Sequence, residues 1–355
     1  MSMAIFPNAL TTAVIEITRR CNLRCPFCYS ASGEARSFEL SLAEMQGIMA
    51  DLRSLGCYRV AILGGELLLR PDWYEIALAA KNAGMALQLL SNGLLVTGEI
   101  RSQFKSLDPQ AVGVSFDGAT PETYRLVRGA DGYAKVRRLL DDLVNDGFHQ
   151  VSAITTFNAK TLGDFDRFVS MFIDTPIVWE VQMAHKLTDR FPADLLMNRE
   201  QYLWFVDKVT DALYNLHGRL KIAPKDDFGY FPMTPKLRFL CQTWRGCHAG
   251  SSSVGIRSNG DVVPCLMVGE KFVEDNLRRR PLVEIWRDPN SFARFRNKSA
   301  QLTGKCAKCP FGAICKAGCS AMAISQTGTL TETPFCIRQL EQEKIIKEMI
   351  EWCAK

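Results

Sequence analysis

Residues 13–28 carry the sequence AVIEITRRCNLRCPFC, in which an alternating run leads directly into three cysteines. The alternation of apolar and polar residues over 13–18 predicts a β-strand, so the cysteines lie in the loop after its carboxyl end. Their spacing is Cys21-x3-Cys25-x2-Cys28. Three thiolates in one tight loop suit three corners of a 4Fe–4S cluster with an open fourth iron, whereas a structural zinc ion takes four protein ligands. The loop therefore favours iron–sulfur chemistry over zinc.

The alternation of strand and helix continues from this loop to residue 185. Short apolar runs predict strands at 13–18, 58–63, 85–90, 111–115, 151–156 and 177–182. Helical spacing of apolar residues predicts helices at 41–55, 72–83, 99–106, 134–145 and 162–173. Strands that alternate with helices form right-handed βαβ units and a parallel sheet. Six strands are fewer than the eight that close a TIM barrel, so the predicted fold class is α/β, a partial (β/α)6 TIM-like barrel open on one side.

The positions of the cysteines divide the chain into parts. The sequence has 13 of them, and none lies between Cys57 and Cys241. The predicted organisation is a partial barrel over 1–185, a bridging segment over 186–240 with a helix at 200–216, and a small cysteine-rich cluster-binding domain over 241–355. Glycine and cysteine break this last part into short pieces, apart from helices near 282–287 and 337–352.

Composition excludes several classes of protein. The chain has 355 residues, of which 47% are hydrophobic and 23% charged, which is typical of a globular protein and not of a disordered one. No apolar run approaches the roughly 18 residues of a membrane span, and the start lacks a signal peptide, so we expect a cytoplasmic protein. A net charge of +5 from 43 basic and 38 acidic residues is too balanced to indicate nucleic-acid binding. Clustered cysteines in a cytoplasmic chain usually indicate metal.

Three further motifs lie where predicted strands end. They are Gly64-Gly65-Glu66, Ser91-Asn92-Gly93 and Ser115-Phe116-Asp117-Gly118. Each one alone is also an ordinary turn sequence. Because the carboxyl ends of parallel strands meet at one edge of the sheet, we expect these motifs and the cysteine triplet to form a common site.

Eight more cysteines crowd into the C-terminal part. They are Cys241, Cys247, Cys265, Cys306, Cys309, Cys315, Cys319 and Cys336. Eight thiolates make two sites of four ligands each, which suits either two zinc ribbons or two iron–sulfur clusters. Cys57 and Cys353 are left over, and we interpret Cys57 as a small core residue before a strand and Cys353 as incidental on the last helix.

The triplet after a first strand resembles the radical S-adenosylmethionine (SAM) superfamily, and the resemblance extends over residues 13–185. It implies that Cys21, Cys25 and Cys28 bind a 4Fe–4S cluster whose open iron chelates SAM. The positions that match the SAM site of the family are Phe27, Gly64, Gly65, Glu66, Ser91, Asn92 and Ser115, with Arg128 a candidate partner for the SAM carboxylate. A solvated arginine at a helix end is the alternative for Arg128. The family usually has proline where Leu67 stands here.

Residues 241–340 resemble the SPASM extension of radical SAM enzymes, which binds two auxiliary 4Fe–4S clusters. In that family the ligands interleave along the chain. Carried over, auxiliary cluster I takes Cys241, Cys247, Cys265 and Cys319. Auxiliary cluster II takes Cys306, Cys309, Cys315 and Cys336. Full ligation by protein suits electron transfer, so the resemblance implies three 4Fe–4S clusters, SAM and an external one-electron donor of flavodoxin or ferredoxin type.

The resemblance implies reductive cleavage of SAM to a 5′-deoxyadenosyl radical, which abstracts hydrogen from a substrate C–H bond. SPASM enzymes mostly act on peptides, so we expect a maturase that crosslinks, rearranges or excises the backbone of a ribosomally made precursor peptide. Only residues 1–12 precede the predicted first strand, so we expect leader recognition by a separate small protein or by the sheet edge.

Three alternatives stand beside the peptide maturase. A maturase of a tetrapyrrole or other small cofactor would use the same clusters. A sulfatase-type formylglycine maturase is disfavoured, because such enzymes carry Asp where Leu266 follows Cys265 here. A non-catalytic electron carrier would explain the eight C-terminal cysteines but not the triplet with its open position.

The catalytic base follows from no motif. Glu180, His185 and Asp189 near the end of the sixth strand are candidates. The aromatic stretch Phe228-Gly229-Tyr230-Phe231, beside Asp226 and Asp227, is a candidate wall of a substrate groove. The favoured alternative for this stretch is a loop that packs on the barrel.

Overall fold

The computed structural model describes residues 9–225, 228, 231–237 and 246–354. Among these residues, ten strands form one sheet in the order β10-β9-β8-β1-β2-β3-β4-β5-β6-β7. The strands of the predicted barrel are β1 (Thr12–Glu16), β2 (Arg59–Leu63), β3 (Ala86–Ser91), β4 (Ala111–Ser115), β5 (Val151–Phe157) and β6 (Val178–Met183), followed by β7 (Ile222–Pro224). Each pairs in parallel with the next, which confirms the partial barrel.

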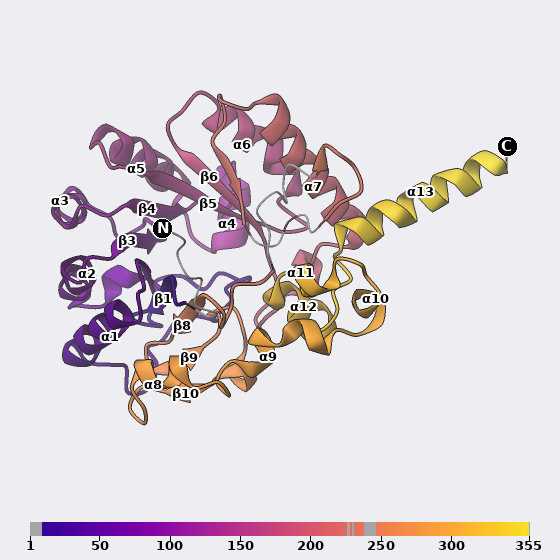
Figure 1. Cartoon of the computed structure of the whole chain (residues 1–355). Coiled ribbons are helices and arrows are strands. Elements are labelled where there is room, and N and C mark those ends of the chain that lie inside the picture. Colours follow the sequence, from indigo (N-terminus) through magenta and orange to yellow (C-terminus); the bar gives the residue numbers. More distant parts are fainter. Residues whose placement is uncertain (1–8, 226–227, 229–230, 238–245, 355) are drawn as a thin grey trace, which may run out of the picture.

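Helices cover the outside of this curved sheet (Figure 1). They are α1 (Leu42–Ser54), α2 (Trp73–Asn82), α3 (Gly98–Leu107), α5 (Tyr133–Asn145), α6 (Phe165–Phe172) and α7 (Arg199–Asn215). The short helix α4 (Pro121–Arg128) follows β4 and lies nearer the middle of the molecule (Figure 1). The predicted helices are confirmed. Helix α4 was not predicted, since its eight residues carry few apolar positions, but Thr120 caps it and Pro121 is its first residue.

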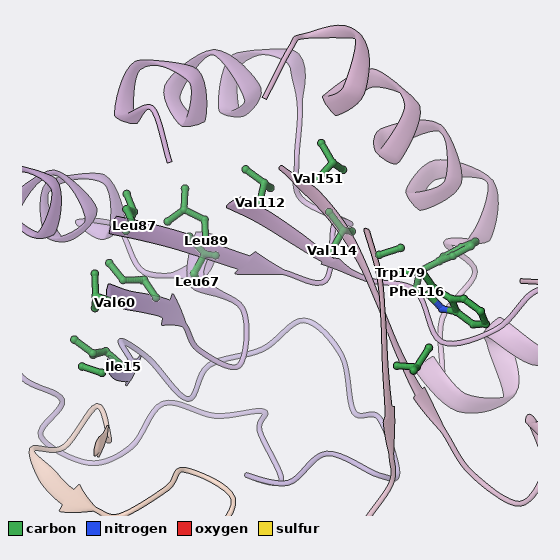
Figure 2. Close-up of a cluster of buried hydrophobic side chains, with 14 of the residues drawn as sticks. Ile15, Val60, Leu67, Leu87, Leu89, Val112, Val114, Phe116, Val151 and Trp179 are labelled. Atoms are coloured by element: carbon green, nitrogen blue, oxygen red, sulfur yellow. The ribbon is translucent and has the colours of Figure 1, made fainter. Parts of the chain in front are cut away.

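The core lies between the sheet and these helices. Figure 2 shows the apolar side chains that the strands contribute, among them Ile15, Val60, Leu89 and Val112, which are all fully buried. At the far end, Trp179 of β6 packs among phenylalanines, and its Nε1 donates a hydrogen bond to Thr155 Oγ1 at 2.9 Å. This close packing fixes the strands, and with them the loops at their carboxyl ends.

A strand from the C-terminal part completes the sheet next to β1. Strand β8 (Ser253–Ile256) pairs in parallel with β1, with Thr12 opposite Ser253 and Ile15 opposite Ile256. Strands β9 (Asp261–Val263) and β10 (Asp275–Asn276) follow in antiparallel order. The edge of the predicted six-stranded barrel at β1 is therefore covered, and the cysteine-rich part continues the same sheet.

The rest of the C-terminal part is built from short helices. They are α8 (Leu282–Arg287), α9 (Ala293–Arg296), α10 (Gly304–Ala307), α11 (Gly312–Cys315), α12 (Ser320–Thr327) and the long α13 (Ile337–Cys353). Short 3₁₀ turns are η1 (Leu67–Leu69), η2 (Leu162–Asp164), η3 (Ala193–Leu195), η5 (Glu270–Phe272) and η6 (Lys298–Gln301). Helix α13, in yellow, projects away from the body of the molecule (Figure 1). In the described part of the chain, no helix combines the length and the apolar character needed to span a membrane.

Candidate functional site

The cysteine triplet lies in a closed loop after β1. Backbone hydrogen bonds join the two ends of the loop, from Cys21 N to Gly33 O at 2.9 Å and from Gly33 N to Arg19 O at 3.1 Å. Within it, Leu23 N lies 3.4 Å from Cys21 Sγ, and Ser32 N lies 3.4 Å from Cys28 Sγ. Backbone amides are thus directed at two of the three sulfur atoms, as amides are at the ligands of an iron–sulfur cluster. Burial raises the pKa of Cys21, and the Leu23 amide opposes this rise.

The Gly64-Gly65-Glu66 motif holds this loop from the end of β2. Gly65 N donates to Thr18 O at 2.7 Å, and Glu66 N donates to Arg20 O at 2.9 Å. A Cβ atom on Gly65 would lie 2.5 Å from Arg20 O, which is closer than real Cβ atoms approach oxygen. Glycine is therefore required here for contact between two backbones. The close approach expected of this motif is made to the cysteine loop.

Glu66 joins the ends of β2 and β3. Its side chain is 1% exposed and accepts hydrogen bonds from Ser91 Oγ at 2.9 Å and from Asn92 N at 2.8 Å. Burial raises the pKa of Glu66, while these donors and Arg128 act in the opposite direction. Asn92 Nδ2 in turn donates to Asn22 Oδ1 at 2.7 Å, inside the cysteine loop. Three of the predicted strand-end motifs are thus brought together.

A buried ion pair also lies beside the triplet. Arg128, the last residue of α4, places Nη1 2.9 Å from Asp117 Oδ2, and Asp117 Oδ1 accepts from Thr156 N at 2.6 Å. The Cys25 thiol donates to the carbonyl of Arg128 at 3.7 Å. Burial alone would lower the pKa of Arg128, but the charges of Cys25 and Asp117 raise it overall, so the guanidinium stays cationic.

The charges and free donors around the triplet indicate whether its residues suit an iron–sulfur cluster and SAM. Burial raises the pKa of Cys25 to about 11, and Arg128 opposes this rise. A positive iron would compensate the buried thiolate further. The Nε of Arg128 is buried and has no hydrogen-bond partner among the described residues, so a donor remains for an anionic group. The donor set therefore fits both groups, and the solvated alternative for Arg128 is wrong.

A segment after β6 covers the triplet. Phe27 packs against Ala184, Phe191 and Leu195. Arg190 donates to Ser32 O at 2.8 Å and to Ala31 O at 2.9 Å, both in the cysteine loop. Ser115 is partly buried at the carboxyl end of β4. The cover shields one side of the triplet from water.

The three candidates for the catalytic base lie in different surroundings. His185 is 4% exposed, directly after the buried Ala184 of this cover. Glu180 forms an ion pair with Lys225 next to β7. Asp189 is exposed. Of the three, His185 is therefore the one enclosed with the covering segment.

The structure brings together the four cysteines predicted for auxiliary cluster II. Cys306, Cys309, Cys315 and Cys336 line one small cavity, and Phe231 and Phe311 close it with stacked rings 4.9 Å apart. Burial and the neighbouring Cys336 charge raise the pKa of Cys315 to about 12. Burial raises that of Cys336 to about 11, and the charges of Cys306 and Cys309 add to this rise. Each thiol is therefore within electrostatic range of its predicted co-ligands.

The cysteines predicted for auxiliary cluster I are described in part. Cys247 and Cys265 pack on the same small apolar cluster, which also contacts Tyr29 from the triplet loop. Cys319 is the N-cap of α12. Cys241 lies outside the described residues, as do Asp226, Asp227, Gly229 and Tyr230 of the predicted groove. Phe228 packs on Phe205 at 5.1 Å, which favours the packed-loop interpretation of that stretch.

Two cysteines lie apart from these groups. Cys57 is fully buried and its thiol donates to Arg59 O at 3.2 Å, as expected for a core residue. Cys353 is exposed at the end of α13.

Sequence reasoning missed Lys298, because a single lysine in η6 belongs to no motif. It is 1% exposed, and its Nζ donates to Gly318 O at 3.2 Å and to Ser320 Oγ at 3.1 Å. Burial lowers the pKa of Lys298 overall, and the charges of the Cys247, Cys319, Cys315 and Cys306 thiolates oppose this fall. Gly318, which accepts the hydrogen bond from Lys298, ends a run of three residues with left-handed backbone. The φ values of Lys316, Ala317 and Gly318 are 53°, 55° and 66°. Two non-glycine residues in this region cost roughly 1–2 kcal/mol each, so the connection between Cys315 and Cys319 is strained.

Known proteins resemble the chain in both of its parts. Residues 15–172 match the radical SAM superfamily, and residues 247–310 match the iron–sulfur cluster-binding domain called SPASM. The chain is 30% identical to the AdoMet-dependent heme synthase of Methanosarcina barkeri, over 94% of this chain and 98% of that protein. It is 29% identical to the mycofactocin maturase MftC of Mycobacterium tuberculosis, over 86% of this chain and 77% of MftC. The solved structure of Streptococcus suis SuiB bound to precursor peptide SuiA has the same fold, with a TM-score of 0.74 and 18% identity over 94% of this chain and 76% of SuiB.

Proposed function

Because this chain belongs to the radical SAM superfamily and carries a SPASM domain, we propose that Cys21, Cys25 and Cys28 hold its catalytic 4Fe–4S cluster. The protein is a radical SAM enzyme, whose cofactors are SAM and iron–sulfur clusters. Together these groups supply, when bound, the hydrogen-abstracting radical chemistry of the family. One observation carries the site assignment: the hydrogen bonds of Glu66 and Asn92 join the ends of β2 and β3 to the cysteine loop.

In this proposal each strand-end motif has a task. Gly64 and Gly65 let the end of β2 approach the cysteine loop and fix its position. Arg128 supplies a buried positive charge beside Cys25, and its partnerless Nε is the donor for the SAM carboxylate. Phe27 and the segment that packs on it exclude water from one side. Glu66, Ser91, Asn92 and Ser115 line the SAM site from the ends of β2, β3 and β4.

We assign the auxiliary clusters by the same reasoning. Cys306, Cys309, Cys315 and Cys336 share a cavity and would hold auxiliary cluster II. Cys247, Cys265 and Cys319, with Cys241, would hold auxiliary cluster I. Four protein ligands at each site leave no open position, which suits transfer of electrons and not binding of substrate.

We propose a precursor peptide as the substrate, with a crosslink, rearrangement or backbone excision as the outcome. The support is the similarity to a maturase, MftC, and the common fold with SuiB, which binds a precursor peptide. A separate small leader-binding protein, an electron donor of flavodoxin or ferredoxin type and a cytoplasmic location with reduced thiols belong to the same proposal. His185 is our candidate for the base, because it is buried next to the segment that covers the triplet.

A second candidate substrate is a tetrapyrrole. The observation that favours it is the 30% identity to a heme synthase over almost the whole of both chains. A tetrapyrrole maturase would use the same triplet and auxiliary cysteines, so the two candidates differ in substrate alone.

The test begins with SAM cleavage by reduced, anaerobically purified enzyme. Wild-type protein should release 5′-deoxyadenosine, and the C21A/C25A/C28A variant should release none while it keeps roughly eight irons in two 4Fe–4S clusters. C353A is the matched control, since Cys353 is exposed and outside every proposed site. Cleavage by the triple variant would refute the triplet assignment.

The substrate is tested with the same preparation. A short peptide encoded beside the gene should change mass in the presence of SAM, whereas a porphyrin substrate should be consumed if the enzyme is a tetrapyrrole maturase. Turnover of the porphyrin without any change in the peptide would replace the first candidate by the second.

A further inference from the structure

A buried ammonium group lies beside Cys319, and the η6 turn that carries it packs on α11, which ends at Cys315. Lys298 is 1% exposed, and burial of a charge is unfavourable unless partners compensate it. Its Nζ has two hydrogen-bond acceptors, Gly318 O at 3.2 Å and Ser320 Oγ at 3.1 Å. These two residues flank Cys319, so the ammonium is anchored directly beside a proposed ligand of auxiliary cluster I.

The charges around Lys298 come from both sets. Burial lowers the pKa of Lys298, and the charges that oppose this fall belong to Cys247 and Cys319 of proposed cluster I and to Cys315 and Cys306 of proposed cluster II. The connection from Cys315 to Cys319 joins the two sets through three residues, all with left-handed backbone. The hydrogen bond from Lys298 to Gly318 O holds the last residue of this strained connection in place.

We propose that Lys298 serves both auxiliary clusters, as a positioning residue for the Cys315–Cys319 connection and as a positive charge that makes both clusters easier to reduce. The inference rests on the ligand assignment proposed above. A 4Fe–4S cluster with four thiolate ligands carries negative charge, and reduction adds one more. A nearby buried cation stabilises the reduced form, because a low dielectric screens the attraction weakly.

The test measures the midpoint potentials of the auxiliary clusters by titration followed by electron paramagnetic resonance. The C21A/C25A/C28A background removes the signal of the third cluster. Lys298→Met removes the charge at similar volume and should lower the equilibrium constant for reduction about tenfold, which is ~60 mV for one electron. Lys308→Met is the matched control, since Lys308 is exposed between Cys306 and Cys309 and its charge is solvated. It should change the constant by less than about twofold.

Iron content distinguishes the possible failures. If the background protein binds no auxiliary iron, the ligand assignment is wrong and the role of Lys298 falls with it. If the iron is present and Lys298→Met shifts the potentials no more than Lys308→Met does, only the role of Lys298 is overturned.

A charge-conserving variant covers the case in which Lys298→Met loses its clusters. Lys298→Arg should then restore both the iron content and potentials close to those of the background. Two results for the arginine variant would overturn the proposal. One is that it binds no auxiliary iron, and the other is that its equilibrium constant for reduction falls about tenfold relative to the background, which is ~60 mV.

Discussion

Arg128 and Asp117 form an ion pair in which both side chains are buried, 8% and 1% exposed, with Nη1 and Oδ2 2.9 Å apart. The pair connects the end of α4 to the loop after β4, and the carbonyl of Arg128 accepts a hydrogen bond from Cys25. A short helix that sequence periodicity did not reveal therefore brings a permanent positive charge to the cysteine triplet.

Arg128→Gln should destabilise the protein strongly, because it leaves Asp117 as a buried carboxylate without its cation. We expect a loss of about 3 kcal/mol in the free energy of unfolding, measured by urea denaturation of cluster-free protein. Arg125→Gln is the control on the same helix, since its ion pair with Asp131 is exposed on both sides, and should cost about 0.5 kcal/mol or less. Equal losses in the two variants would contradict a structural role for the buried pair.

Gly65→Ala should displace the cysteine loop, because the added methyl group would lie 2.5 Å from Arg20 O. The expected result is a loss of most of the iron held by the triplet, with the auxiliary iron retained, measured as iron per chain after anaerobic reconstitution. Gly47→Ala is the comparison, since Gly47 lies in α1 with open space around it. It should stabilise the helix by roughly 0.5–1 kcal/mol and leave the iron unchanged. Normal iron content in Gly65→Ala would show that the loop tolerates the displacement.

Glu66→Gln should weaken SAM binding at least about tenfold, because an amide NH2 would face donors where a carboxylate oxygen now accepts them. The dissociation constant for SAM, measured by calorimetry with the reconstituted enzyme, checks this. Glu75→Gln, an exposed change in the first turn of α2, should leave SAM affinity unchanged. If Glu66→Gln binds SAM as tightly as wild type, the junction of β2 and β3 does not shape the site.

Removal of the clusters by a chelator should loosen the C-terminal part far more than the barrel. Helices α10 and α11 have four residues each and are too short to be stable alone. Metal ligation would then supply much of the free energy that orders them. Hydrogen exchange should accelerate at least about tenfold over 304–336 and stay slow in β2 and β3. A uniform acceleration would indicate that the two parts unfold as one unit.

The barrel could be predicted from the sequence because local pattern determines it. The spacing of apolar residues within a dozen residues or so predicts strands such as 111–115 and helices such as 134–145. The structure has both elements at nearly the same positions. Strand β8 could not be predicted, since the four residues Ser253–Ile256 resemble a loop and their partner β1 lies far away in the sequence.

The residues of the site likewise divide into those that the sequence predicts and those that only the folded structure reveals. Cysteine spacing is readable along the chain, and the four cysteines 306, 309, 315 and 336 do share a cavity. The burial of Arg128 and Lys298 is not readable, because it depends on which elements pack over them. Nor does the sequence tell whether Gly65 approaches a ligand or, as the structure shows, another loop of the protein.

The pairing of β1 with β8 also constrains how the chain matures during its synthesis. Thr11 Oγ1 at the start of β1 donates to Ser252 O, 241 positions later. At roughly 5–20 residues per second on the ribosome, the strand that leads into the cysteine triplet waits about 12–48 s for its second neighbour. Throughout that interval one side of β1 is an open strand edge, able to pair with other chains. The nascent protein is therefore exposed to misassembly beside the loop in which we propose that the catalytic cluster is inserted.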